Sequence, residues 1–95
     1  MPNSDITEDW RYRTAAPDLR GQTLWKERWR APRPSWDHDH CEFCWAKFSE
    51  SIEGALREGY VTAGGREWVC PACFADFRDA FDFTLGTGPR PQTDS

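Results

Sequence analysis

Four cysteines, arranged as two identical pairs, constrain the fold of this chain more than any other feature. The pairs are Cys41-x-x-Cys44 and Cys70-x-x-Cys73, and 25 residues separate them. Two residues between thiolates allow a tight turn in which both sulfurs reach one ion at about 2.3 Å. One pair leaves two of the four tetrahedral positions of zinc open, and a second pair closes the site. The sequence therefore predicts a structural Zn²⁺ site formed by all four cysteines.

Two other uses of paired cysteines are less consistent with the sequence. A redox-active CxxC motif is typical of a βαβ context, and no such pattern surrounds either pair. Disulfides are disfavoured in the reducing cytosol, and the polar start of the chain, "MPNSDITED", lacks the apolar core of a secretion signal. No run approaches the roughly 20 apolar residues that cross a bilayer. We therefore expect a cytoplasmic protein that does not associate with membranes.

The 95 residues allow at most one domain, in which a metal ion would compensate for a small apolar core. The run "GYVTAGGREWV" contains two β-prone segments on either side of Gly64 and Gly65. Glycines supply the positive φ angles of two-residue hairpin turns, so this run predicts a β-hairpin. A short helix is also predicted in "WAKFSESIEGALREG", because Trp45, Phe48 and Leu56 fall at helical spacing with Ile52.

A second helix is predicted after the hairpin, in "CPACFADFRDAFDFTLG". Phe74, Phe77 and Phe81 would share one apolar face of it. Leu85 followed by Gly86 predicts the end of this helix and its C-terminal cap.

The order of these motifs resembles the treble-clef class of zinc fingers. In that class a zinc knuckle supplies one cysteine pair, and the first turn of a helix that follows a β-hairpin supplies the other. Here "CEFC" matches the knuckle, and "CPACFADF" matches the helix start, with Pro71 where its missing N–H is harmless. The resemblance extends from about Trp36 to Leu85 and is specific to the fold rather than to a function. It implies a small α+β zinc-stabilised domain with a knuckle, a β-hairpin and a C-terminal helix.

An extended N-terminal arm is expected to precede this finger. In "LRGQTLWKERWRAPRPSW" an alternating pattern places Trp25 and Trp29 on one face, although a helix would also align them. The resulting organisation is a disordered N-terminus (1–18), a basic aromatic arm that packs on the finger (19–36), the zinc-binding domain (37–86) and a disordered tail (87–95).

Two histidines, His38 and His40, stand immediately before the first cysteine pair. Four sulfurs leave no room for imidazole on the ion, so we expect His40 to pack beside the site or to donate to a sulfur. Replacement of one cysteine ligand by either histidine is an alternative. An HNH-like metal nuclease would need a further histidine or asparagine on the helix, and "CPACFADFRDAF" has neither. A single base without that ligand cannot activate water on a metal, so we do not expect an enzyme.

Six tryptophans are many for so short a chain. Trp45 and Trp68 lie within the finger and are expected in its core. Trp25, Trp29 and Trp36 lie outside it, where they either pack back onto the finger, which we favour, or stay available to a partner.

Two functional classes follow from the charge pattern. The formal net charge is -4, yet the arm is basic. The first class is a monomeric protein-interaction module, such as an adaptor, an inhibitor or an immunity-like protein, with Trp25, Arg28, Trp29 and Arg30 as candidate contacts. The second is a nucleic-acid-binding zinc finger that uses the same basic arm, with affinity that falls steeply with salt. The acidic finger favours a protein partner.

Overall fold

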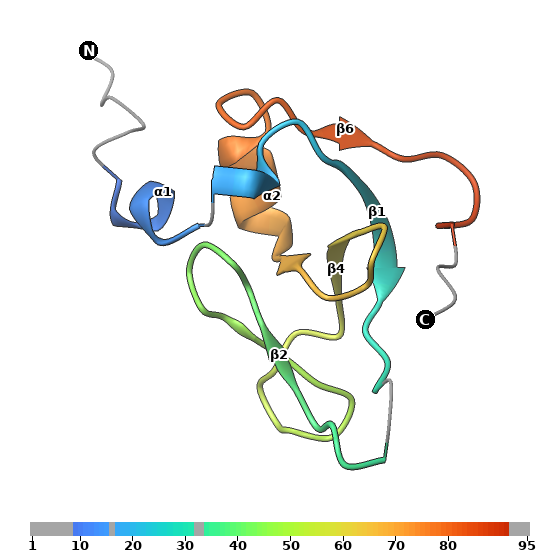
Figure 1. Cartoon of the computed structure of the whole chain (residues 1–95). Coiled ribbons are helices and arrows are strands. Elements are labelled where there is room, and N and C mark those ends of the chain that lie inside the picture. Colours follow the sequence, from blue (N-terminus) through green and yellow to red (C-terminus); the bar gives the residue numbers. More distant parts are fainter. Residues whose placement is uncertain (1–8, 16, 32–33, 92–95) are drawn as a thin grey trace.

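The computed structural model describes residues 9–15, 17–31 and 34–91, which form a mixed α+β domain (Figure 1). Its elements in chain order are the helix α1 (Trp10–Thr14), a 3₁₀ turn η2 (Pro17–Leu19), the strands β1 (Thr23–Arg28), β2 (Asp39–His40), β3 (Lys47–Phe48), β4 (Glu58–Thr62) and β5 (Trp68–Val69), the helix α2 (Pro71–Phe77) and the strand β6 (Thr84–Leu85). Neither helix in this described part of the chain has the length and apolar character that crossing a membrane requires.

The larger sheet has four strands in the order β5-β4-β1-β6. β1 lies inside it, antiparallel to β4 from Leu24↔Thr62 to Arg28↔Glu58 and parallel to β6 through Thr23↔Thr84. The extended conformation expected for this segment is therefore confirmed. Its place differs from expectation, because residues 23–28 form a central strand of the domain rather than an arm packed on a separate finger.

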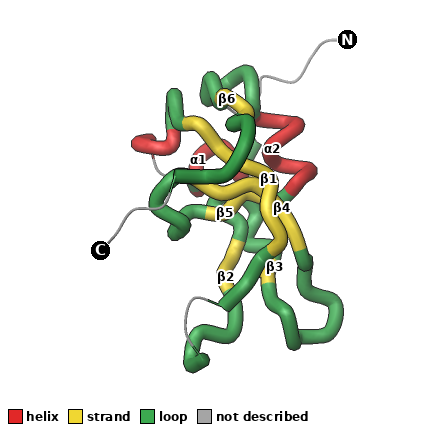
Figure 2. The backbone as a smooth tube through the Cα atoms, turned by 90° about the vertical axis from the view of Figure 1, so that its right-hand side faces the viewer, coloured by secondary structure: helices red, strands yellow, loops and turns green. Residues whose placement is uncertain are grey.

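A second, two-stranded sheet flanks the segment that contains the first cysteine pair. β2 and β3 pair antiparallel, with His40 opposite Lys47, and they extend away from the larger sheet (Figure 2). The segment between them forms the knuckle, which is closed by a hydrogen bond from the Cys41 N–H to the Ala46 carbonyl at 2.8 Å. Trp45 within the knuckle has a left-handed φ of 68°, a conformation that few non-glycine residues adopt.

The helix predicted over residues 45–59 does not form, so that prediction was wrong. Phe48 belongs to β3, and the chain then turns back so that Leu56 forms a bridge beside it. The hydroxyl of Ser49 accepts hydrogen bonds from the N–H groups of Ser51 and Ile52, which fixes the turn. Side-chain acceptors of this kind compete with a helix for the same backbone donors.

The predicted hairpin is confirmed. β4 and β5 pair through Tyr60↔Val69 and Val61↔Trp68. The connection is longer than the predicted two residues, since the N–H of Thr62 bonds to the carbonyl of Glu67 at 3.2 Å. Gly65 supplies the positive φ, at 78°.

The second helix is shorter than predicted. α2 begins at Pro71, with Cys70 as N-cap, and ends at Phe77 rather than near Leu85. Asp82, with a φ of 57°, helps to reverse the chain, which then continues into β6. Leu85 therefore pairs with β1 as a strand residue, and the expected cap at Gly86 was wrong.

An aromatic cluster fills the core between α2, the knuckle and the strands. Phe43 of the knuckle stacks on Phe77 of α2 with ring centroids 4.6 Å apart. Phe74 stacks on Tyr60 of β4 at 3.9 Å. The predicted burial of all three phenylalanines at helical spacing is confirmed, because Phe81, although beyond α2, is buried with Phe74 and Phe77.

Parts of both ends for which disorder was expected have defined structure. The carboxylate of Asp9 caps α1 by accepting from the N–H of Arg11 at 2.9 Å, and Tyr12 packs edge-on against Phe81 at 5.3 Å. Near the other end, Arg90 donates to Glu27 at 2.8 Å and to the carbonyl of Ala63 at 3.1 Å. Residues 1–8 and 92–95 lie outside the described part.

Candidate metal centre

The four cysteines come together from the knuckle and the start of α2. Their Sγ atoms all lie within 4.8 Å of one another, and those of Cys44 and Cys70 are 3.7 Å apart. All four are free thiols rather than disulfides. A tetrahedron with metal–sulfur bonds of about 2.3 Å has edges of about 3.8 Å. The set therefore fits a single tetrahedral metal ion, and the all-sulfur donors favour zinc.

Backbone N–H groups point at the sulfurs, as the knuckle geometry predicts. Cys41 Sγ accepts from the N–H groups of Phe43 at 3.4 Å and Cys70 at 3.3 Å. Cys70 Sγ accepts from the N–H of Cys73 at 3.4 Å, in the first turn of α2. These donors favour the thiolate forms that bind a metal.

The thiols strongly affect one another's ionisation. Hydrogen bonds from Cys70 and then Cys73 lower the pKa of Cys41 to about 2. The Cys41 side chain in turn raises the pKa of Cys70 to about 11, and it raises the pKa of Cys73 as well. Four thiolates this close repel one another, and a divalent cation between them offsets that repulsion.

A fifth residue, Arg11 of α1, contacts the cluster. Its Nη1 donates to Cys73 Sγ at 3.5 Å and lies 3.0 Å from a carboxylate oxygen of Asp76. Its Nη2 lies 2.7 Å from Asp9 Oδ2, and its guanidinium lies 4.8 Å from the centroid of the Phe77 ring. The hydrogen bond with Asp9 is the main cause that raises the pKa of Arg11, so this cation is permanent.

Sequence reasoning missed Arg11, because Cys73 lies 62 positions further along the chain and no motif links the two residues. The one local signal was Asp9 immediately before an N-terminal helix, in a segment for which disorder was expected.

The histidines lie beside the centre rather than in it. Among the described residues, the group able to hold a metal contains the four cysteines and neither His38 nor His40. His38 bonds to Asp37 at 2.6 Å, which lowers the pKa of that carboxyl. The His40 ring packs edge-on against His38 at 4.8 Å and against Trp45 at 5.7 Å.

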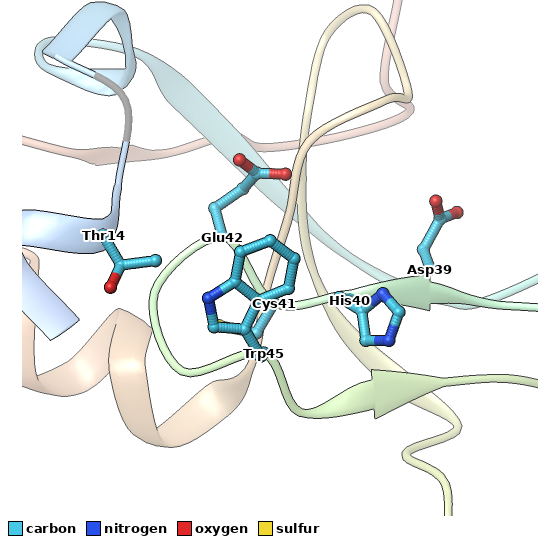
Figure 3. A pocket seen from close by; sticks show the side chains of 6 residues that line it. All are labelled: Thr14, Asp39, His40, Cys41, Glu42 and Trp45. Atoms are coloured by element: carbon cyan, nitrogen blue, oxygen red, sulfur yellow. The ribbon is translucent and has the colours of Figure 1, made fainter.

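A surface hollow of about 280 Å³ lies next to the knuckle. It is lined by Thr14 of α1, by Asp39 and His40 of β2, and by Cys41, Glu42 and Trp45 of the knuckle (Figure 3). Burial raises the pKa of Glu42, and the charge of Glu67 adds to the effect.

The tryptophans are distributed differently from the prediction. Trp45, expected in the core, is 61% exposed, whereas Trp68 is buried as predicted. Trp29 is only 1% exposed, and its Nε1 donates to Asp39 Oδ2 at 2.9 Å. Packing of this tryptophan into the domain is the alternative that we favoured, and it leaves the side chain unavailable as a partner contact.

The remaining candidate contacts divide into two groups. Trp25 is half-buried and lies so close to Gly86 that a Cβ atom there would meet the indole at 2.3 Å. Arg28 and Arg30 are exposed. Of the four predicted contact residues, only Arg28 and Arg30 are thus exposed to solvent.

Comparisons of the chain with protein-family models, with curated proteins and with solved structures found no match. The candidate centre is thus defined by its own geometry, as a group of four cysteines suited to one metal ion in a small α+β domain.

Proposed function

We propose that this protein is a treble-clef-type module in which structural zinc holds together a surface that binds another protein. Four sulfurs fill the tetrahedral positions of zinc, so the ion keeps none for water or a substrate. Its role in this proposal is to fix the knuckle against α2, and the protein is not an enzyme. An adaptor, an inhibitor or an immunity-like protein that binds as a monomer would have these properties.

The observation that carries this proposal is the exposure of two indoles, Trp45 in the knuckle and Trp10 on α1, the helix that contacts the centre through Arg11. Trp10 is 59% exposed and Trp45 61% exposed. Thr14 follows Trp10 by one helical turn, on the same side of α1, and lines the hollow with Trp45. Tryptophan is enriched among the residues that dominate protein–protein binding energy.

A nucleic-acid partner has narrower support. Lys26, Arg28 and Arg30 are exposed along and after β1, where they would neutralise phosphates. Of the three indoles in the basic arm, Trp29 is buried, Trp25 is half-buried and Trp36 is exposed. The basic side chains are thus accompanied by one exposed indole of the arm, whereas binding along a single strand uses several stacking side chains.

An HNH-like nuclease has less support still. His38 and His40 precede the knuckle, and α2 contains no histidine or asparagine. A general base without a metal-binding partner does not hydrolyse phosphodiesters in that way.

A capture experiment distinguishes the first two functions. Zinc-loaded protein is immobilised and exposed to lysate of its source, one half untreated and one half treated with nuclease, alongside the variants Trp10→Ala/Trp45→Ala and Lys26→Ala/Arg28→Ala/Arg30→Ala. The proposal predicts a specific protein that is retained at high salt, lost with the tryptophan variant and kept with the basic variant. Capture that vanishes with the basic variant, or retention of nucleic acid alone, would contradict it.

A further inference from the structure

The hollow beside the knuckle is negatively charged. Asp39 and Glu42 are among the residues that line it, and no described cation forms an ion pair with either carboxylate, although Asp39 Oδ2 accepts a hydrogen bond from Trp29 Nε1. Cys41 also lines it, and a zinc ion with four thiolates carries a net charge of about -2. Arg11 offsets part of that charge at Cys73, which is not among the lining residues. The hollow therefore presents negative potential to whatever enters it.

Aromatic rings form the other part of the wall. The indole of Trp45 lies between Thr14 and His40 in Figure 3, and both carboxylates extend on the same side of the rings in that view. His40 contacts Trp45 edge-on, which restrains the indole although most of it faces solvent. An indole face attracts a cation within about 6 Å of its centroid, and tryptophan is the strongest side chain for this interaction.

The hollow is large enough to receive one side chain. Its volume of about 280 Å³ lies close to the lower limit of the roughly 300–1,000 Å³ of pockets that enclose drug-sized ligands. It is open to solvent between α1 and the knuckle, so a side chain projecting from a partner can enter it (Figure 3).

We propose that the hollow formed by Asp39, Glu42 and Trp45 receives an arginine or lysine side chain of the protein partner. The Glu42 carboxylate pairs with the cationic head, Asp39 adds negative charge while its Oδ2 stays bonded to Trp29, and the Trp45 indole covers the flank of the bound side chain. This inference rests on the proposed function as a protein-binding module, and it adds the chemistry of the partner and the place where it binds.

Peptide titration of the zinc-loaded, ¹⁵N-labelled full chain tests this inference without knowledge of the partner. The probes are Ac-Gly-Arg-Gly-NH₂ and Ac-Gly-Lys-Gly-NH₂, with Ac-Gly-citrulline-Gly-NH₂ as the uncharged match. We expect the indole N–H of Trp45 and the amides of Glu42 and His40 to shift with the charged peptides and not with citrulline.

Substitutions then localise the effect. Glu42→Gln keeps the shape of the side chain and removes its charge, so the apparent Kd should rise roughly three- to tenfold. Glu53→Gln, which changes an exposed carboxylate that does not line the hollow, should leave it unchanged. Zinc content and unchanged spectra elsewhere establish that the variants are folded.

Three results would overturn the inference. The first is shifts of equal size with the citrulline peptide, and the second is an apparent Kd that rises no more for Glu42→Gln than for Glu53→Gln. The third is shifts that follow protein concentration alone, which would identify a second copy as the occupant. If one of these results is obtained while the Trp10/Trp45-dependent capture persists, the proposed function stands and the assignment of a basic side chain to the hollow is wrong. If capture fails, the proposed function is contradicted whatever the peptides do.

Discussion

Arg11 Nη1 donates to the Sγ atom of Cys73 at 3.5 Å, so a helix outside the cysteine-containing segment contacts the metal centre. The same guanidinium is fixed by Asp9 and Asp76. A cation held in this way offsets the negative charge of a zinc ion bound by four thiolates. It also ties the N-terminal helix to the stability of the centre.

Arg11→Ala should therefore weaken zinc binding. Residues that hydrogen-bond to metal ligands typically contribute 10- to 100-fold to affinity. We predict a loss of about tenfold, measured by competition with a chromogenic chelator, and a smaller loss for Arg11→Lys because lysine keeps the charge without the planar fork. Arg13→Ala, at an exposed position on the same helix, is the control. Equal affinities for Arg11→Ala and Arg13→Ala would show that the contact contributes nothing.

Gly59→Ala tests the packing between β4 and the knuckle sheet. A Cβ atom at Gly59 would lie 2.6 Å from Phe48 Cε1 and 2.9 Å from the carbonyl oxygen of Val69. Overpacking of this kind costs roughly 1–3 kcal/mol, so the midpoint of urea unfolding should fall. Gly64→Ala is the matched control, because nothing lies within 4 Å of its Cβ position and its φ is not positive. A similar midpoint for both variants would contradict the close approach of Phe48 to β4.

Trp29→Phe tests the part-buried hydrogen bond between Trp29, the residue that follows β1, and Asp39 of β2. The change keeps an aromatic ring and removes the N–H that donates to Asp39 at 2.9 Å. Leaving that carboxylate without its donor should lower the free energy of unfolding by about 1–2 kcal/mol. Trp36→Phe, at a solvent-exposed position, should change it by less than about 0.5 kcal/mol. The comparison uses chemical denaturation of the zinc-bound protein, and an unaffected Trp29→Phe variant would refute the contact.

Arg90→Ala should loosen the segment that follows β6. Arg90 joins this segment to Glu27 of β1 and to the carbonyl of Ala63, while the N–H of Gly86 bonds to the carbonyl of Leu24 at 2.7 Å. The ion pair is part-exposed, so the global cost should stay below about 1 kcal/mol. Hydrogen exchange at Gly86 should nevertheless become several-fold faster, with Arg66→Ala as the control. Unchanged exchange would mean that Arg90 does not hold the segment in place.

Local chemistry made part of this fold predictable. The CxxC spacing permits one ligand geometry, Gly65 permits the loop of the hairpin, and Pro71 after Cys70 marks a helix start. Each of these signals acts within a few residues, which is the range over which backbone sterics decide the structure. The four-cysteine group of the candidate site followed from them directly.

Features that depend on distant contacts were missed. The apolar spacing of Trp45, Phe48 and Leu56 also fits a strand with a return bridge, and short apolar runs do not distinguish the two. Trp45 lies outside the core because the knuckle gives it a positive φ, which hydrophobicity alone does not indicate. The five residues of α1 are too few to form a stable helix alone, so its existence depends on Arg11 and Tyr12 reaching the region around α2.

Zinc stoichiometry and thiol alkylation, followed together by native mass spectrometry before and after chelation, give the most direct test of the metal centre. We predict one zinc ion per chain with all four cysteines protected, and complete alkylation with loss of cooperative unfolding once zinc is removed. Binding of a structural zinc ion contributes on the order of 10 kcal/mol to such small domains. A metal-free chain that still unfolds cooperatively, or a zinc-bound chain whose cysteines alkylate freely, would contradict a fold held together by this ion.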